Sequence, residues 1–285
     1  MNRSPAMLSE ADVLQSLMQW AEDDDNIRLI ILNGSRGDST RTPDELSDYD
    51  VSVIMRDPEQ ALDDHWIARF GEVMVRWPRT PGDTGLPGWI TQLVLFRSGL
   101  RIDFQFGSTA IRSIECAGAF QCVLLDRDRL SERIRRLPVS GTHVQPPREE
   151  EFIERINAFW WDVPYVAKAL RRQELDYVRF IMDSDLRFEK IHPLLRWKIG
   201  IDHGAATDVG IFGRWFPRYL SRPTWERYLA TFSGADSEEQ WQAMFAMCGL
   251  VRELGTEIAD HYGFIYPSET DERVTTYLYQ LFEGR

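Results

Sequence analysis

The sequence predicts an α+β protein in which an N-terminal domain, a mixed β-sheet flanked by helices, is followed by an all-helical C-terminal domain. Short apolar runs such as IRLIIL and DYDVSVIM, bounded by turn-forming residues, indicate strands in the first half of the chain. From about Arg148 onward the apolar residues recur at helical spacing instead. The segment Val144-Gln145-Pro146-Pro147 marks the boundary, so we predict domains at 1–147 and 148–285.

The N-terminal elements follow from the period of their apolar residues and from the turn formers between them. Two neighbouring strands, WITQLVLF and RIDFQF, flank a short turn and are expected to form a hairpin. In chain order we predict a helix at 9–24, a strand at 27–32, a loop at 36–47, a strand at 48–55, a helix from Asp57-Pro58 to about 70, a short strand at 72–77, a loop at 84–88, the hairpin strands at 89–96 and 101–106, and a strand at 121–128.

Strand patterns are missing from the C-terminal half of the sequence, where long amphipathic segments take their place. Four segments have clear helical spacing, at 150–175, 186–204, 222–234 and 238–263. This change from strand-like to helical spacing of the apolar residues, rather than a flexible linker or a repeat, predicts a second domain.

Composition narrows the class of protein. The formal net charge is −12, which disfavours a nucleic-acid partner and makes a cationic substrate plausible. No apolar run is long enough to span a membrane, no signal peptide is recognisable, and no protein partner is indicated. Cys116, Cys122 and Cys248 form no CxxC pair, so we expect reduced core thiols and a cytoplasmic protein.

Three aspartates form the candidate reaction centre. On a strand, Asp48 and Asp50 lie on one face, and Asp103 shares a face with Arg101 and Gln105 on a later strand. If the two strands are neighbours, the three carboxylates meet, and they need compensation by a cation. Mg²⁺ suits carboxylates together with phosphate oxygens. The alternatives are a solvated strand start for the first pair and an exposed strand face for Asp103.

A Gly34-Ser35 turn directly precedes these acids in the chain. Glycine lets the backbone approach a phosphate closely, and the serine hydroxyl and free N–H groups can bond its oxygens. The loop lacks the GxxxxGK[ST] pattern of a P-loop.

These elements, in this order and spacing, resemble the nucleotidyltransferase superfamily of the polymerase β type. Over nearly its whole length the chain is similar to the aminoglycoside 6-adenylyltransferases, the streptomycin-modifying group. The stretches that carry the resemblance are IRLIILNGSR, LSDYDVSVIM, LVLF with RIDFQF, VLLDRD, FWWDVPYVAKALRRQEL, LRWKIGIDHG and RWFPRYL. Family members often carry lysines before the RYL stretch, where this chain has Ile211 and Arg214.

The resemblance implies an N-terminal nucleotidyltransferase domain and Mg²⁺-dependent transfer of AMP from ATP to a cationic aminoglycoside, with streptomycin and its 6-hydroxyl as the expected acceptor. Asp48, Asp50 and Asp103 would be catalytic and would hold the metal, and Asp103 could be a base, a ligand or both. We expect Gly34, Ser35, Arg36 and Lys198 to contact the nucleotide, and Trp160, Asp162 and Glu174 to contact the aminoglycoside.

Each of these assignments has a structural alternative. Arg36 can be a solvated loop residue, Lys198 a surface lysine, and Trp160 a helix core residue, since aromatic residues at helical spacing usually pack inside. Single carboxylates such as Asp162 and Glu174 can be solvated helix acids. For the whole protein, the alternatives are another small-molecule or protein acceptor, or a nucleotide-binding module without catalysis.

Overall fold

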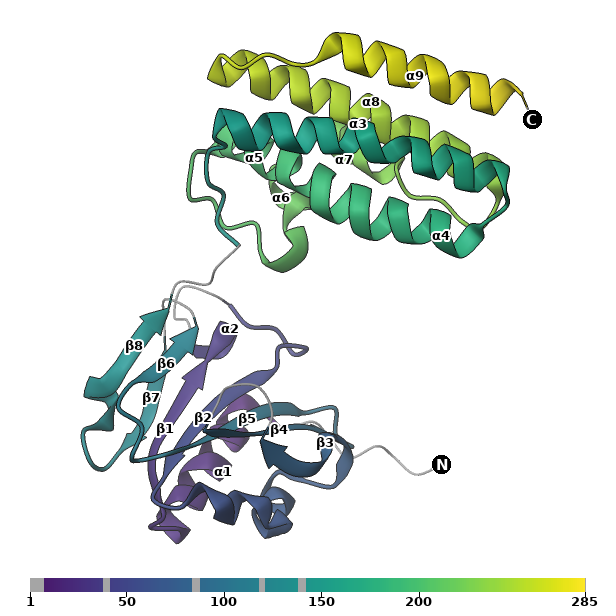
Figure 1. Ribbon diagram of the computed structural model, residues 1–285. Coiled ribbons are helices and arrows are strands. Elements are labelled where there is room, and N and C mark those ends of the chain that lie inside the picture. Colours follow the sequence, from purple (N-terminus) through teal and green to yellow (C-terminus); the bar gives the residue numbers. More distant parts are fainter. Residues whose placement is uncertain (1–7, 38–41, 84–87, 118–120, 138–141, 285) are drawn as a thin grey trace. The chain divides into compact units, whose positions relative to one another are not determined.

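A computed structural model of the 285-residue chain describes residues 8–37, 42–83, 88–117, 121–137 and 142–284. The chain divides into two compact units, Met1–Val139 and Ser140–Arg285. The first contains the β-sheets and the second is helical, so the predicted fold class is confirmed (Figure 1). In the described part of the chain, no helix has the length and apolar character needed to cross a membrane.

The first unit is built on a six-stranded mixed sheet with the strand order β3-β4-β5-β2-β1-β7. Neighbouring strands run antiparallel except β2 and β5, which are parallel. The strands are β1 (Ile27–Asn33), β2 (Tyr49–Met55), β3 (Val73–Asp83), β4 (Trp89–Phe96), β5 (Arg101–Ser108) and β7 (Cys122–Asp126). The predicted hairpin of β4 and β5 is confirmed.

One face of this sheet is covered by α1 (Glu10–Asp23) and by two short 3₁₀ helices, η1 (Pro58–Leu62) and η2 (Asp64–Phe70) (Figure 1). The Trp20 and Trp66 rings stack at 4.8 Å over the apolar side chains of the central strands. The prediction of one helix from Asp57 to about residue 70 was wrong. Asp63 ends the first 3₁₀ helix and caps the second by accepting a bond from the His65 N–H, so the segment breaks there.

The opposite face of the sheet has an apolar part and a polar part. A small cluster including Leu29, Ile31 and Ile54 packs against residues from η3 (Leu130–Arg133) and from β6 (Ile114–Ala117). β6 pairs in parallel with β8 (Ile134–Leu137) in a second, two-stranded sheet that the sequence pattern did not predict. The remainder of the face carries the polar side chains described below, at the start of β2 and β5.

Two further expectations, on the loops of this unit and on the cysteines of the chain, have different outcomes. The predicted loop after β1 begins with a helical turn, α2 (Gly34–Gly37), and residues 38–41 of that loop lie outside the described residues, as do residues 84–87 of the loop at 84–88. Cys248 is a buried free thiol, as expected. The expectation of a core position was wrong for Cys122, which is exposed because it lies on the edge strand β7.

The second unit packs its helices around a large apolar core that includes the buried Trp160 and Trp241. Eleven residues of η4 are wound as a π-helix that continues directly from α4 into α5. The helices are α3 (Glu149–Arg171), α4 (Leu175–Phe180), η4 (Ile181–Ile191), α5 (His192–His203), η5 (Ile211–Gly213), α6 (Phe216–Tyr219), α7 (Arg222–Leu229), α8 (Ser237–Tyr262) and α9 (Ser268–Glu283).

A buried carboxylate fastens α9 to the rest of this unit. Asp271 is 2% exposed and accepts hydrogen bonds from the Arg252 guanidinium of α8, from the Tyr266 hydroxyl and from Thr275. The Tyr266 hydroxyl in turn accepts a 3.2 Å bond from Trp160 Nε1 of α3. One aspartate therefore links three helices through a satisfied network.

Replacing this carboxylate should destabilise the second unit. In Asp271→Ala the Arg252 and Tyr266 donors lose their shared acceptor, and we expect a loss of about 3 kcal/mol in the free energy of unfolding, measured by urea denaturation. Glu269→Ala is the matched control, because Glu269 pairs with Arg273 in the same helix but is exposed. A control that loses as much stability as Asp271→Ala would contradict this account.

Candidate active site

The parallel pairing of β2 and β5 brings the predicted aspartates together. Asp50 is the register partner of Asp103, and Tyr49 is the partner of Ile102. Asp48 directly precedes β2 and lies beside the start of β5. Because side chains alternate along a strand, Asp48, Asp50 and Asp103 all lie on the face of the sheet away from α1. The condition set by the sequence, that the two strands are neighbours, is met.

The three carboxylates differ in exposure, and two of them have perturbed acidity. The side chain of Asp48 is 41% exposed and that of Asp103 is 18% exposed. Burial raises the pKa of Asp50, and the charges of Asp103 and Asp48 raise it further. Burial also raises the pKa of Asp48, with the Arg101 charge opposing that shift. Removing carboxylates from water near one another disfavours their charged forms.

Arg101, at the start of β5, partly compensates this charge. Its Nε and Nη2 donate 3.1 Å bonds to the two carboxylate oxygens of Asp103, and its Nε lies 3.4 Å from Asp48 Oδ2. Hydrogen bonding to Asp103 raises the pKa of the guanidinium, so it remains charged. One positive charge therefore faces three carboxyl groups.

The turn after β1 forms the second wall of the site. Gly34 has a φ of +64°, and a Cβ built on it would lie 2.1 Å from Asp50 Oδ2. A side chain here would meet the carboxylate and would also strain the backbone. Ser35 follows in the helical turn α2, so the turn predicted to lie near the aspartates approaches Asp50 at Gly34.

Asn33 and Ser52 extend the polar face behind Asp50, and neither is among the site residues predicted from the sequence. Asn33 is the register partner of Asp50 and donates a 2.9 Å bond from Nδ2 to Ser52 Oγ. The Asn33 Oδ1 atom is buried and has no hydrogen-bond partner among the described residues. The signal was present in the strand period, which puts Ser52 on the face of Asp48 and Asp50.

The donor atoms of this site fit a hard divalent cation. Carboxylate oxygens from β2 and β5 converge, and the Arg101 guanidinium leaves part of their negative charge uncompensated. Such oxygen ligands, completed by phosphate and water oxygens, suit Mg²⁺. Among the described residues no three His, Cys, Asp or Glu side chains are already arranged as a metal-ligand set. A metal would therefore have to draw its ligands together.

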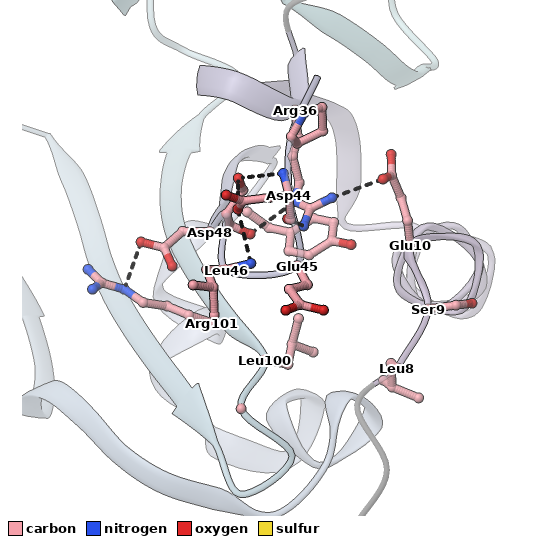
Figure 2. Close-up of a pocket in the computed structure, with 14 residues that line it drawn as sticks. Leu8, Ser9, Glu10, Arg36, Asp44, Glu45, Leu46, Asp48, Leu100 and Arg101 are labelled. Atoms are coloured by element: carbon pink, nitrogen blue, oxygen red, sulfur yellow. Dashed lines mark hydrogen bonds and ion pairs between the residues drawn. The ribbon is translucent and has the colours of Figure 1, made fainter. Parts of the chain in front are cut away.

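A pocket of about 300 Å³ adjoins Asp48 and Arg101 in the first unit, and Figure 2 shows its lining. Acidic side chains from the N-terminus of α1 and from the loop before β2 contribute to it, among them Glu10, Glu45 and Asp48. The pocket offers polar space beside two residues of the acid site.

Arg36 also lines this pocket, but its guanidinium has a structural role (Figure 2). Its side chain is 7% exposed, pairs with Glu10 at 2.9 Å and donates bonds to the backbone carbonyls of Ser47 and Asp44. It also lies over the Tyr49 ring at 4.1 Å. Arg36 thus stabilises the loop before β2, and its side chain is not solvated. Its predicted contact with the nucleotide stays a prediction.

The predicted residues of the second unit are placed individually. Lys198 pairs with Asp202 at 2.8 Å and Glu257 at 3.3 Å; burial opposes its charge, but these acids raise its pKa overall. Glu174 is exposed in the turn between α3 and α4. Asp162 forms an ion pair with Lys190 at 3.2 Å, and Lys190 also pairs with Asp185.

The assignment of Trp160 to the aminoglycoside site was wrong. Its side chain is 1% exposed and its indole Nε1 donates a hydrogen bond to the Tyr266 hydroxyl, so it belongs to the helical core. The next residue, Trp161, is 73% exposed. The helix period turns neighbouring side chains by about 100°, which is why one member of the pair is inside and the other outside.

Comparison with known proteins identifies the family. A sequence model of the streptomycin adenylyltransferase family matches residues 7–281. The chain is 28% identical to the aminoglycoside 6-adenylyltransferase of Bacillus subtilis, over 95% of this chain and 97% of the relative. It is 27% identical to that of Campylobacter jejuni, over 95% of both chains. A crystal structure of an aminoglycoside 6-adenyltransferase from Bacillus subtilis aligns over 96% of this chain and 99% of that one, with 22% identity and a TM-score of 0.48.

The structure has a Gly-Ser turn after one strand, paired aspartates at the start of the next and a third aspartate in register on a parallel neighbour, which is the arrangement that the resemblance to nucleotidyltransferases led us to expect. The family match is more specific and covers almost the whole chain. This protein belongs to the streptomycin adenylyltransferase family, and the expectation that it is an enzyme of the adenylyltransferase class is confirmed.

The contact between Gly34 and Asp50 can be tested by adding one methyl group. In Gly34→Ala the new Cβ meets Asp50 Oδ2, so the carboxylate must move, and we expect adenylyl transfer to fall on the order of a hundredfold. Gly263→Ala is the matched control: its φ is +75°, but a Cβ there meets nothing within 4 Å. Similar activity losses in both variants would show that backbone strain, not displacement of Asp50, is responsible.

The raised pKa of Asp50 predicts a pH-dependent stability. Because the folded state holds this proton more tightly than the unfolded state does, stability falls as the pH rises through the raised pKa of Asp50. Asp50→Asn should therefore raise the melting temperature of the metal-free protein at neutral pH, by about 2–4 °C. The gain should shrink at pH values below that pKa, where wild-type Asp50 is protonated.

Asp44→Asn provides the contrast, because hydrogen bonds from Ser47 and the Leu46 N–H lower the pKa of Asp44. That substitution should not stabilise the protein at neutral pH. A lower melting temperature for Asp50→Asn than for wild type, without metal at neutral pH, would contradict the assigned desolvation of Asp50.

Proposed function

We propose that this protein transfers AMP from ATP to a hydroxyl of an aminoglycoside, with the 6-hydroxyl of streptomycin as the acceptor and Mg²⁺ as the cofactor. The observation that carries the proposal is the register pairing of Asp50 with Asp103 beside the Gly34 turn. The family match and the relatives named aminoglycoside 6-adenylyltransferases support the acceptor class.

In the proposed reaction the acceptor hydroxyl oxygen attacks the α-phosphorus of ATP, the bond to the β-phosphate oxygen breaks, and pyrophosphate leaves. Asp48, Asp50 and Asp103 would hold Mg²⁺, which when bound neutralises charge on the attacking and leaving oxygens. Arg101 contacts Asp48 and Asp103, and Asp103 is the less exposed of the two. In the proposed reaction either Asp103 or solvent takes up the proton of the acceptor hydroxyl. Gly34 and Ser35 would position the phosphates through backbone N–H groups and the serine hydroxyl.

Residues of the second unit would complete substrate binding in this proposal. Lys198 is a charged group on α5 that suits a phosphate. To bind the nucleotide it would have to break its ion pair with Asp202 or Glu257. Glu174 and Asp162 are carboxylates suited to the guanidinium groups of streptomycin. Glu174 is exposed, whereas Asp162 must release Lys190.

The acceptor is identified by pyrophosphate release in the presence of ATP and Mg²⁺. We expect release with streptomycin and none with kanamycin or spectinomycin measured in parallel. Asp50→Ala and Asp103→Asn should abolish release while the protein keeps its fold by circular dichroism, because both remove a carboxylate at the reaction centre. Asp63→Asn is a control for loss of an acid in the same unit, since Asp63 lies between η1 and η2.

Each other result has a definite meaning. Release with a different aminoglycoside keeps the chemistry and discards streptomycin as the acceptor. Release in the Asp50→Ala variant discards the assigned reaction centre. Silence with every acceptor, in a folded protein that binds ATP, leaves nucleotide binding and discards the proposed transfer.

A further inference from the structure

Arg101 occupies the atoms that a metal ion would need. Both carboxylate oxygens of Asp103 accept bonds from Arg101, Oδ1 from Nε and Oδ2 from Nη2, each at 3.1 Å. The same Nε lies 3.4 Å from Oδ2 of Asp48. A cation that binds Asp48 and Asp103 through these oxygens must therefore compete with the guanidinium. Each oxygen keeps a second lone pair, but two positive charges at this range repel each other.

The guanidinium has both the freedom and the geometry to change partners. Its side chain is 45% exposed, at the start of β5 next to the turn that joins the two hairpin strands. It also borders the pocket beside Asp48 (Figure 2). The planar fork that bonds both oxygens of a carboxylate matches two oxygens of a phosphate equally well.

Charge balance gives a reason for the exchange. Without a metal, Arg101 compensates the negative charge of Asp48 and Asp103, which it contacts at 3.4 Å and 3.1 Å. With a divalent cation bound, the carboxylates no longer need the guanidinium, and the strongest remaining negative charge in the site is that of the nucleotide phosphates.

We propose that Arg101 is an exchangeable counter-ion: it holds Asp48 and Asp103 in the metal-free protein, and it moves to a phosphate group when a metal–nucleotide complex binds. This inference rests on the proposed function, because it requires the acid site to take a metal and a nucleoside triphosphate. It makes Arg101 a phosphate-binding residue as well as a competitor of the metal.

The two roles predict opposite changes in one variant. In Arg101→Gln, Mn²⁺ alone should bind about threefold to fivefold more tightly, because a competing half-exposed ion pair is gone. A non-hydrolysable ATP analogue, titrated at saturating Mn²⁺, should bind about tenfold more weakly, because a charge-assisted fork to phosphate is lost. Electron paramagnetic resonance of free Mn²⁺ measures the first change and calorimetry measures the second.

Two further variants keep the test decisive. Arg97→Gln is the matched control: Arg97 lies in the same hairpin turn and pairs with Glu72 at 2.6 Å, outside the acid site, so both affinities should stay at the wild-type values. Arg101→Lys keeps the charge and loses the fork. Its Mn²⁺ affinity should lie between the affinities of wild type and Arg101→Gln, and its analogue binding should still be weaker than that of wild type. If Arg101→Gln does not fold, Arg101→Lys provides the test.

Unchanged or weaker Mn²⁺ binding in Arg101→Gln would overturn the counter-ion role, and unchanged analogue binding would overturn the transfer to phosphate. Absence of the metal–nucleotide site that the proposed function requires has a different signature. In that case wild-type protein itself binds neither Mn²⁺ nor the analogue with Mn²⁺, and Arg101 then has no cation with which to exchange.

Discussion

The parallel pairing of β2 with β5 is the constraint on which the site depends. It places Asp50 directly opposite Asp103 and puts Asp48 beside Arg101, in a sheet whose other neighbours are antiparallel. A shift of either strand by one residue would turn its polar side chains toward the apolar face and separate the aspartates. The stacked aromatic residues on that face, with Trp20 and Trp66 against Phe104 and Phe106, make such a shift costly.

The same pairing concentrates negative charge that folding alone would not favour. Asp50 is partly buried between Gly34 and Asp103, where its charged form is disfavoured, and Arg101 supplies one compensating charge at the rim. Repulsion of this kind costs stability, and groups with perturbed acidity cluster at functional sites. Stability elsewhere is provided by well-satisfied groups, such as Asp271 with its three donors.

The helical unit shows how a charged residue type can carry several different roles. Asp271 is buried and structural, Asp162 is bridged by Lys190, and Glu174 is exposed at a turn. Their sequence contexts are alike, since each lies in or beside an amphipathic helix. Helix period separates inside from outside, as Trp160 and Trp161 show, but it does not tell a solvated carboxylate from one that contacts a substrate.

The sequence by itself determined the α+β class, the helical second half, most strands, and the Gly34, Asp48, Asp50 and Asp103 constellation. These features depend on local periodicity and on turn chemistry, which a single chain displays directly.

Only the tertiary structure decided that β5 and β1 are the neighbours of β2, and hence that Arg101 lies beside Asp48 and Asn33 beside Asp50. It also decided that Arg36 bonds backbone carbonyls of the loop before β2. The exposed edge position of Cys122 and the small β6–β8 sheet were likewise decided by the tertiary structure. The physical reason is that partner choice for a charged or edge residue depends on groups far away in the chain, and no local pattern records them.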